Sequence, residues 1–172
     1  QAIDRCKLIP RSSICFVQKD QDRMRDHSEK FGIASGALQE VVDVSDVLIL
    51  AVRPQHAEGV LKQLQQITLA PNKVFITLLA GIQRSWYQKF LSHSVIRVMP
   101  NTPARIGQGL AGIYAPENAK DKLEQAVAIF SSVGKAIILE KEEMIDIITA
   151  VSGSGPAYYF LLMENMIKAA MD

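Results

Sequence analysis

Four short motifs in this sequence combine residue types that could bind a cofactor or a substrate. Three of them, residues 51–55, 79–81 and 99–103, place proline, glycine or a polar side chain directly after an apolar run. The fourth, residues 152–156, has two serines, two glycines and a proline. Each motif alone is typical of an ordinary turn. In an open α/β sheet, ligands bind outside the carboxyl ends of the strands, so three such motifs after consecutive strands predict one shared crevice.

The motif at residues 152–156 has two interpretations. Proline at the first helical position, with Ser or Gly just before it, is typical of a helix start. The free N–H groups and the positive dipole end of such a helix can hold a carboxylate or a phosphate. The alternative is a flexible linker between two domains, and the residues alone do not separate the two.

The residues after the second strand of a dinucleotide-binding domain decide between NAD and NADP, because an acid there binds the ribose hydroxyls. Here the apolar run 14–17 is followed by Gln18 and Lys19. We therefore predict that Lys19 binds the 2′-phosphate and that NADPH is preferred over NADH. The alternative is that Lys19 and Arg23 are solvated charges at a helix start. The glycine-rich fingerprint that would hold the pyrophosphate does not occur in the sequence.

Neither metal binding nor a catalytic triad is predicted from the histidines and cysteines. His27, His56 and His93 have no Ser, Cys or acid at a suitable spacing. Cys6 and Cys15 lack metal-ligand spacing and are too few for a disulfide framework. This cysteine usage favours a reduced, cytosolic protein.

The composition argues against nucleic-acid and membrane partners. The chain has 172 residues, of which 48% are hydrophobic, and 19 basic against 18 acidic residues give a formal net charge of +1. There is no long basic stripe of the kind that nucleic-acid-binding proteins carry. The longest apolar runs fall far short of the ~20 residues that span a bilayer.

The elements that must position the motifs alternate between strands and helices. Predicted strands cover residues 14–17, 46–52, 74–79, 95–99, 110–115 and 136–139, and predicted helices cover 20–31, a segment after Pro54, one after Gly81, one at 123–130 and one at 142–151. The run 46–52 is apolar on both faces, so we expect a central strand of a covered parallel sheet. The alternation with short connections predicts an α/β fold with a mostly parallel sheet.

Both ends of the chain look cut. Ala2, Ile3 and Cys6 suit one helix face without a start signal, and residues 157–172 end inside a helical pattern without a cap. Residues 158–163 are apolar all round, which predicts burial on every side. We therefore expect an internal piece of a longer protein, with this last helix covered by a missing part or a second subunit.

Residues 45–55, 79–82 and 95–103 closely resemble the pyrroline-5-carboxylate reductase family, and residues 149–158 look like its signature. The resemblance implies a partial Rossmann-type dinucleotide-binding domain over residues 1–151. It implies that residues 152–172 are the first helix of an all-helical dimerisation domain, which forms homodimers or higher homo-oligomers. The implied reaction is reduction of 1-pyrroline-5-carboxylate to L-proline by NAD(P)H, the last step of proline biosynthesis.

The resemblance also implies site residues, position by position. The implied cofactor contacts are Ala51, Val52, Arg53, Pro54, Leu79, Ala80, Gly81, Asn101 and Thr102, in addition to Gln18 and Lys19 selected above. The implied substrate contacts are Glu142, Ser152, Gly153, Ser154 and Gly155. Glu142 is also the implied catalytic residue, since a carboxylate near the ring nitrogen can stabilise an iminium. The alternative for Glu142 is a surface acid at a helix start.

Two other functions compete with this one. A β-hydroxyacid-type dehydrogenase has a similar first domain, but it places a catalytic lysine on a helix after its substrate glycines, and Lys168 is the only lysine beyond Ser152. The other is a non-catalytic dinucleotide-binding module. Because the glycine loop is absent, we expect residues 1–172 by themselves to be inactive as a reductase and to self-associate through the apolar helix.

Overall fold

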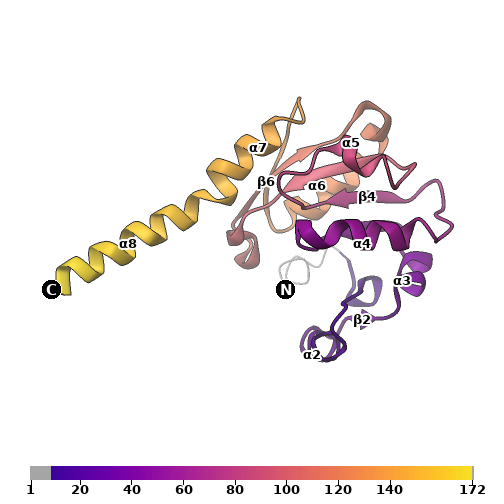
Figure 1. Ribbon diagram of the computed structural model, residues 1–172, viewed down its shortest axis with the longest axis horizontal. Coiled ribbons are helices and arrows are strands. Elements are labelled where there is room, and N and C mark those ends of the chain that lie inside the picture. The colour runs from indigo at the N-terminus through magenta and orange to yellow at the C-terminus, as the bar shows by residue number, and fades with distance from the viewer. Residues whose placement is uncertain (1–8, 172) are drawn as a thin grey trace.

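The computed structural model describes residues 9–171, which form an α/β body from which one long C-terminal helix projects (Figure 1). The predicted helical face at Ala2, Ile3 and Cys6 lies outside the described residues. The helical segments are η1 (Arg11–Ser13), α2 (Gln21–Phe31), α3 (Leu38–Val44), α4 (Pro54–Leu64), α5 (Arg84–Tyr87), η2 (Thr102–Ile106), η3 (Glu117–Lys122), α6 (Leu123–Ser131), α7 (Met144–Ile148), the π-helical turn η4 (Thr149–Gly153) and α8 (Gly155–Met171).

The main sheet has five strands in the order β3-β4-β5-β6-β7. Their bounds are β3 (Val47–Leu50), β4 (Val74–Thr77), β5 (Val95–Met99), β6 (Gly109–Tyr114) and β7 (Gly134–Ile138). The pairs β3·β4, β4·β5 and β6·β7 are parallel, whereas β5 and β6 run antiparallel. The predicted α/β class with a mostly parallel sheet is confirmed.

A second, two-stranded parallel sheet pairs β1 (Cys15–Phe16) with β2 (Ala34–Ser35). The helix α2 connects these strands. Asp20 caps its N-terminus by accepting two backbone N–H groups of the first turn, and Gly32, with φ of 61°, ends it as predicted.

The prediction of a central strand at residues 46–52 is wrong. Within the described residues, β3 forms one edge of the five-stranded sheet. Ile49 on this strand is 40% exposed. An apolar run reports how much of a strand's surface is suited to burial, and it does not determine how many strands pair with it.

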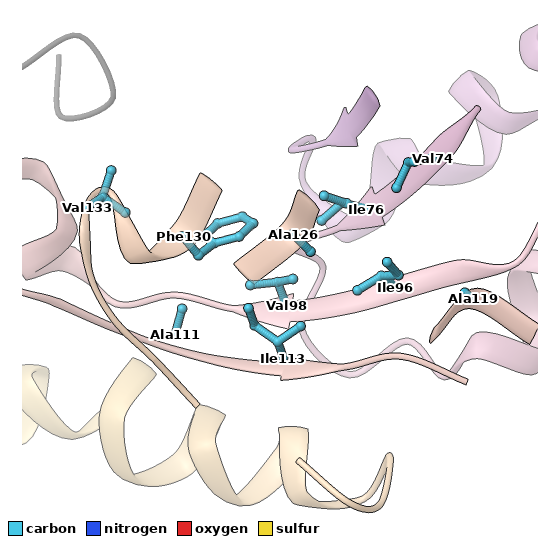
Figure 2. Close-up of a cluster of buried hydrophobic side chains, with 10 residues drawn as sticks. All are labelled: Val74, Ile76, Ile96, Val98, Ala111, Ile113, Ala119, Ala126, Phe130 and Val133. Carbon is cyan, nitrogen blue, oxygen red and sulfur yellow. The ribbon is translucent and has the colours of Figure 1, made fainter. Parts of the chain in front are cut away.

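One face of the sheet packs against α6. Figure 2 shows Ala126 and Phe130 of this helix over Ile76, Val98 and Ile113 of three neighbouring strands. Leu123 and Val127 join them as partly buried neighbours, which confirms the predicted apolar face of α6. Strands alternate their side chains between two faces, so the intervening residues lie on the opposite side.

The opposite face is partly polar. Arg97 lies opposite Thr77 on β4 and opposite Tyr114 on β6. Arg97 and Thr77 are both buried. An apolar cluster from α3, α4, β4, α5 with the segment after it, and β5 continues this face, with Val42, Leu61, Leu64, Phe75, Tyr87, Leu91 and Val95 as its buried members.

The C-terminal segment differs in detail from the helices that the sequence predicts. The helix expected over residues 142–151 is divided into α7 and the turn η4, so Glu142 precedes the helix by two residues. Helix α8 leaves its large apolar side chains exposed, from Tyr158 to Met163 and at Met166, Ile167 and Met171. No helix among residues 9–171 has the length and apolar content needed to cross a membrane.

Candidate cofactor and substrate site

The three strand-end motifs lie on the side of the main sheet where the carboxyl ends of β3, β4 and β5 are found. Strands β3, β4 and β5 are parallel neighbours, so their carboxyl ends point the same way. The loops that follow them start side by side, as the hydrogen bond from the Leu78 N–H to the Leu50 carbonyl (3.1 Å) shows. The motifs therefore lie at the same end of the sheet, and the crevice that they are predicted to line stays a prediction.

The first two loops are largely exposed. Ala51, Arg53 and Ala80 are exposed, and Pro54 starts α4 directly after β3. Gly81 has φ of 71°, a backbone conformation that disfavours side chains, and no atom lies within 4 Å of the position of a Cβ there. The backbone of both loops is therefore open to a ligand.

Leu79 is the exception among these cofactor candidates. Its side chain is buried, and its N–H donates to the Thr77 hydroxyl at 3.3 Å. The side chain of Leu79 thus belongs to the core, and the residue offers only backbone atoms to a cofactor.

Asn101 connects the third loop to the turn before α8. Its side-chain amide donates to the Ser152 hydroxyl at 2.9 Å, and its Oδ1 accepts the Leu110 N–H at 2.8 Å. The structure therefore brings together a predicted cofactor contact and a predicted substrate contact that are 51 residues apart.

The segment around Ser152 is helical. Residues 149–153 form a π-helical turn that follows α7 without a break, and the Ser154 N–H donates to the Thr149 carbonyl at 2.8 Å. Helix α8 then begins at Gly155, so Pro156 is its second residue and not its first. These features favour the helix start over the flexible linker.

Glu142 is held by two other elements. Its Oε1 accepts the backbone N–H of Arg84, the first residue of α5, at 2.6 Å. The same oxygen accepts a hydrogen bond from Arg97 Nη1 on β5 at 3.0 Å. The Glu142 side chain is 20% exposed, so the alternative of a surface acid does not describe its surroundings.

The sequence reasoning missed Arg97, Thr77 and Tyr87. Arg97 is the one charged residue in the buried strand Val95–Met99, which was a signal that this position needs a specific partner. The Thr77 and Tyr87 hydroxyls lie 2.8 Å apart within the same face. Burial raises the pKa of the Tyr87 phenol, and the Thr77 hydrogen bond and the Arg97 charge partly oppose this effect.

Gln18 and Lys19, the predicted contacts of the cofactor 2′-phosphate, lie on a different segment from the other predicted cofactor contacts. The Lys19 N–H donates to Gln18 Oε1 at 2.9 Å, and Lys19 is exposed at the start of α2. Among the described residues, no hydrogen bond or ion pair connects Lys19 to the loops after β3, β4 and β5. The role of Lys19 stays a prediction.

Comparison with known proteins identifies two family models in this chain. The model for NADP oxidoreductases, coenzyme F420-dependent, matches residues 4–81. The model for pyrroline-5-carboxylate reductase dimerisation matches residues 142–172. The pyrroline-5-carboxylate reductase of Coxiella burnetii is 31% identical, with a TM-score of 0.83 over 99% of this chain and 67% of that one. The chain belongs to the pyrroline-5-carboxylate reductase family.

Two further relatives of the pyrroline-5-carboxylate reductase family define how much of it this chain covers. The Pseudomonas aeruginosa pyrroline-5-carboxylate reductase is 42% identical over 76% of this chain but only 48% of its own length. The Plasmodium falciparum pyrroline carboxylate reductase, solved with NADP bound, is 25% identical, with a TM-score of 0.85 over 99% of this chain and 63% of that one. The chain thus spans about half the length of the curated relative it matches.

Proposed function

We propose that this chain is the cofactor-binding part of an enzyme that reduces 1-pyrroline-5-carboxylate to L-proline with NADPH. The hydrogen bond between Asn101 and Ser152 carries the proposal. This bond joins two places: the loops after β3, β4 and β5, where a dinucleotide would bind, and the Ser152 turn, where the family resemblance locates the substrate. Family membership supports the proline-forming reaction over a β-hydroxyacid-type dehydrogenase or a non-catalytic module.

The residues of the loops after β3, β4 and β5 fit the nicotinamide end of a dinucleotide. Small, exposed residues and an open backbone at Gly81 allow close approach of a ring. We assign the cofactor contacts to Ala51, Val52, Arg53, Pro54, Leu79, Ala80, Gly81, Asn101 and Thr102, with Gln18 and Lys19 at the 2′-phosphate. When bound, the reduced nicotinamide supplies the hydride.

The substrate would bind beside the Ser152 turn. We assign the substrate carboxylate to Ser152, Gly153, Ser154 and Gly155, because the family resemblance locates the substrate at this turn. Glu142 is our catalytic candidate. Its Oε1 is engaged by Arg84 and Arg97, whereas its other oxygen accepts no hydrogen bond from any residue in the described part of the chain. That oxygen is available to stabilise the positive charge of the protonated imine.

The helix α8 is the proposed contact with a second copy of the chain. Its exposed apolar side chains and the match of residues 142–172 to a dimerisation model both support a homodimer or a higher homo-oligomer. We propose the domain boundary between residues 151 and 152, within the turn η4 that precedes α8. The cytosolic location stays a prediction.

The test is the oxidation of NADPH by the full gene product in the presence of pyrroline-5-carboxylate. We expect turnover that Glu142→Gln lowers by about tenfold or more, with NADPH binding largely unchanged. Glu143→Gln, next in the chain and exposed, is the matched control. Absence of turnover in the unmodified protein contradicts the proposed function. If Glu142→Gln lowers NADPH affinity as much as it lowers turnover, this residue acts on the cofactor and not on the substrate.

A further inference from the structure

We infer that Arg97 is a positioning residue: it fixes Glu142 and so couples the loop after β4 to the segment that leads into α8. The inference rests on the proposed function for its catalytic consequence, because it concerns the orientation of the candidate catalytic carboxylate. The coupling between the two segments, in contrast, does not depend on the proposed function. Four features of the molecule support the inference.

The first feature is the burial of the Arg97 guanidinium. The side chain is 2% exposed in the middle of β5, between Thr77 and Tyr114 on the adjacent strands. Removing a charge from water costs several kcal/mol, so a buried arginine needs acidic partners with good geometry. The two acidic partners in the described residues are Glu142, at 3.0 Å, and Asp146, at 3.5 Å and 57% exposed.

The second feature is that one oxygen of Glu142 joins two elements. Oε1 accepts from Arg97 on the sheet and from the Arg84 N–H at the start of α5. The N-cap residue of α5, Gln83, makes no side-chain hydrogen bond to the helix. Glu142 therefore satisfies an N–H group that the helix leaves open, and it anchors the segment directly after the exposed loop at Ala80 and Gly81.

The third feature is that the segment after Glu142 is held again at its far end. Ser152 accepts the hydrogen bond from Asn101 on the loop after β5. Beside the apolar packing of Ile145 on Met99, two side-chain hydrogen bonds thus hold residues 142–152, one from Arg97 on β5 and one from Asn101 on the following loop. Loss of the first attachment should change the distance between the loop at residues 79–84 and the turn at residues 149–155.

Arg97 also keeps unsatisfied donors, which distinguishes it from an ordinary structural ion pair. Its Nε and Nη2 are inaccessible and form no hydrogen bond within the described residues. Nη1 donates a hydrogen bond to Glu142, whereas Nη2 forms only the longer ion pair with Asp146, at 3.5 Å. An apolar side chain of similar volume could fill this place at little cost in stability, so the bond to Glu142 is the feature that requires an arginine.

The experiment combines a double-variant cycle with amide hydrogen exchange on the full gene product. Arg97→Met keeps the volume and removes the charge, Glu142→Gln removes the acceptor charge, and both are combined in one protein. We expect Arg97→Met to lower turnover about 10- to 100-fold, with the KM for NADPH nearly unchanged, and to have little further effect when Glu142 is already Gln. Arg97→Lys should restore part of the turnover, and Glu143→Gln, exposed and without a contact to Arg97, is the matched control.

Hydrogen exchange tests the coupling without using activity. Arg97→Met should speed exchange in residues 79–87 and 144–155 and leave α6 protected. The inference is overturned if the double variant loses turnover by the product of the two single losses, which would mean that the two residues act independently. Unchanged hydrogen exchange in both segments would overturn it as well. If the unmodified protein has no reductase activity, the proposed function fails and the exchange data alone decide the role of Arg97. Should Arg97→Met fail to fold, Arg97→Lys and Glu142→Gln provide the same comparison.

Discussion

The side-chain amide of Asn101 donates a hydrogen bond to the Ser152 hydroxyl at 2.9 Å, joining the loop after β5 to the turn before α8. Asn101 makes a second bond, through Oδ1, to the Leu110 N–H at the start of β6. One amide side chain therefore connects three segments. The orientation of the Ser152 turn relative to the sheet depends on it.

Removing Asn101 should lower the free energy of unfolding more than removing the Ser152 hydroxyl. Ser152→Ala loses one hydrogen bond, which is worth about 0.5–1.5 kcal/mol. Asn101→Ala also leaves the Leu110 N–H without its partner, so its cost should be larger, about 1–3 kcal/mol. Urea unfolding measures both, and Ser154→Ala is the control. Equal costs for the two substitutions would show that the Leu110 bond contributes nothing.

Lys19 is the residue that should discriminate between NADPH and NADH. Lys19→Ala should weaken NADPH binding about tenfold, or ~1.4 kcal/mol, because a charged contact to the 2′-phosphate is lost. NADH, which lacks this phosphate, should bind unchanged. Titration of both cofactors against the full gene product tests this, with Lys30→Ala at the other end of α2 as the control. Unchanged NADPH affinity would remove the 2′-phosphate assignment.

The buried Tyr87 should make stability depend on alkaline pH. Its raised pKa means that the folded protein keeps the phenol proton where the unfolded chain, with a pKa near ~10, loses it. Unfolding therefore releases a proton above that pH, so this contribution to stability is complete below about pH 10 and is lost as the pH rises further.

Tyr87→Phe isolates that effect. It should cost about 1 kcal/mol at neutral pH, because the hydrogen bond to Thr77 is lost. Above about pH 10 its stability should fall less steeply than that of the unmodified protein. Urea unfolding across this pH range gives the comparison, and Tyr158→Phe, on the exposed α8, controls for the loss of a phenol. Parallel pH profiles would contradict the prediction.

Gly134 allows a backbone contact between β7 and β6 that no side chain permits. Its φ is 153°, and a Cβ there would lie 2.1 Å from the Gly109 carbonyl oxygen. Gly134→Ala should therefore destabilise the protein by about 3 kcal/mol or more. Gly59 on α4 has no atom within 4 Å of a Cβ, so Gly59→Ala should stabilise it by ~1 kcal/mol. Thermal unfolding of the two variants should shift in opposite directions.

Helix α8 should drive association of the chain. Its exposed apolar residues, Phe160 and Leu161 among them, each gain on the order of 1.5–3 kcal/mol on burial. Phe160→Glu should lower the sedimentation coefficient at a given concentration, whereas Glu164→Gln, on the same helix, should not. A monomer before any substitution would contradict the proposed role of α8.

The sequence by itself determined the fold class and most elements, because local patterns carry that information. Apolar runs marked the buried strands β4 and β5, helical spacing marked α6, and Gly32 ended α2 as predicted. The three motifs that follow these strands do lie at one end of the sheet, since parallel neighbouring strands end together. The family signature at residues 149–158 is likewise a local pattern.

Only the tertiary structure decided which distant residues meet. The edge position of β3 depends on the pairing of other strands, which the hydrophobicity of Ile49 does not encode. The partners of Glu142 lie 45 and 58 residues earlier in the chain, on β5 and at the start of α5. A buried arginine in an apolar strand signals that a partner exists, but the identity of that partner depends on how α7 packs on the sheet. Long-range contacts of this kind arise from the packing of whole elements, so no local pattern specifies them.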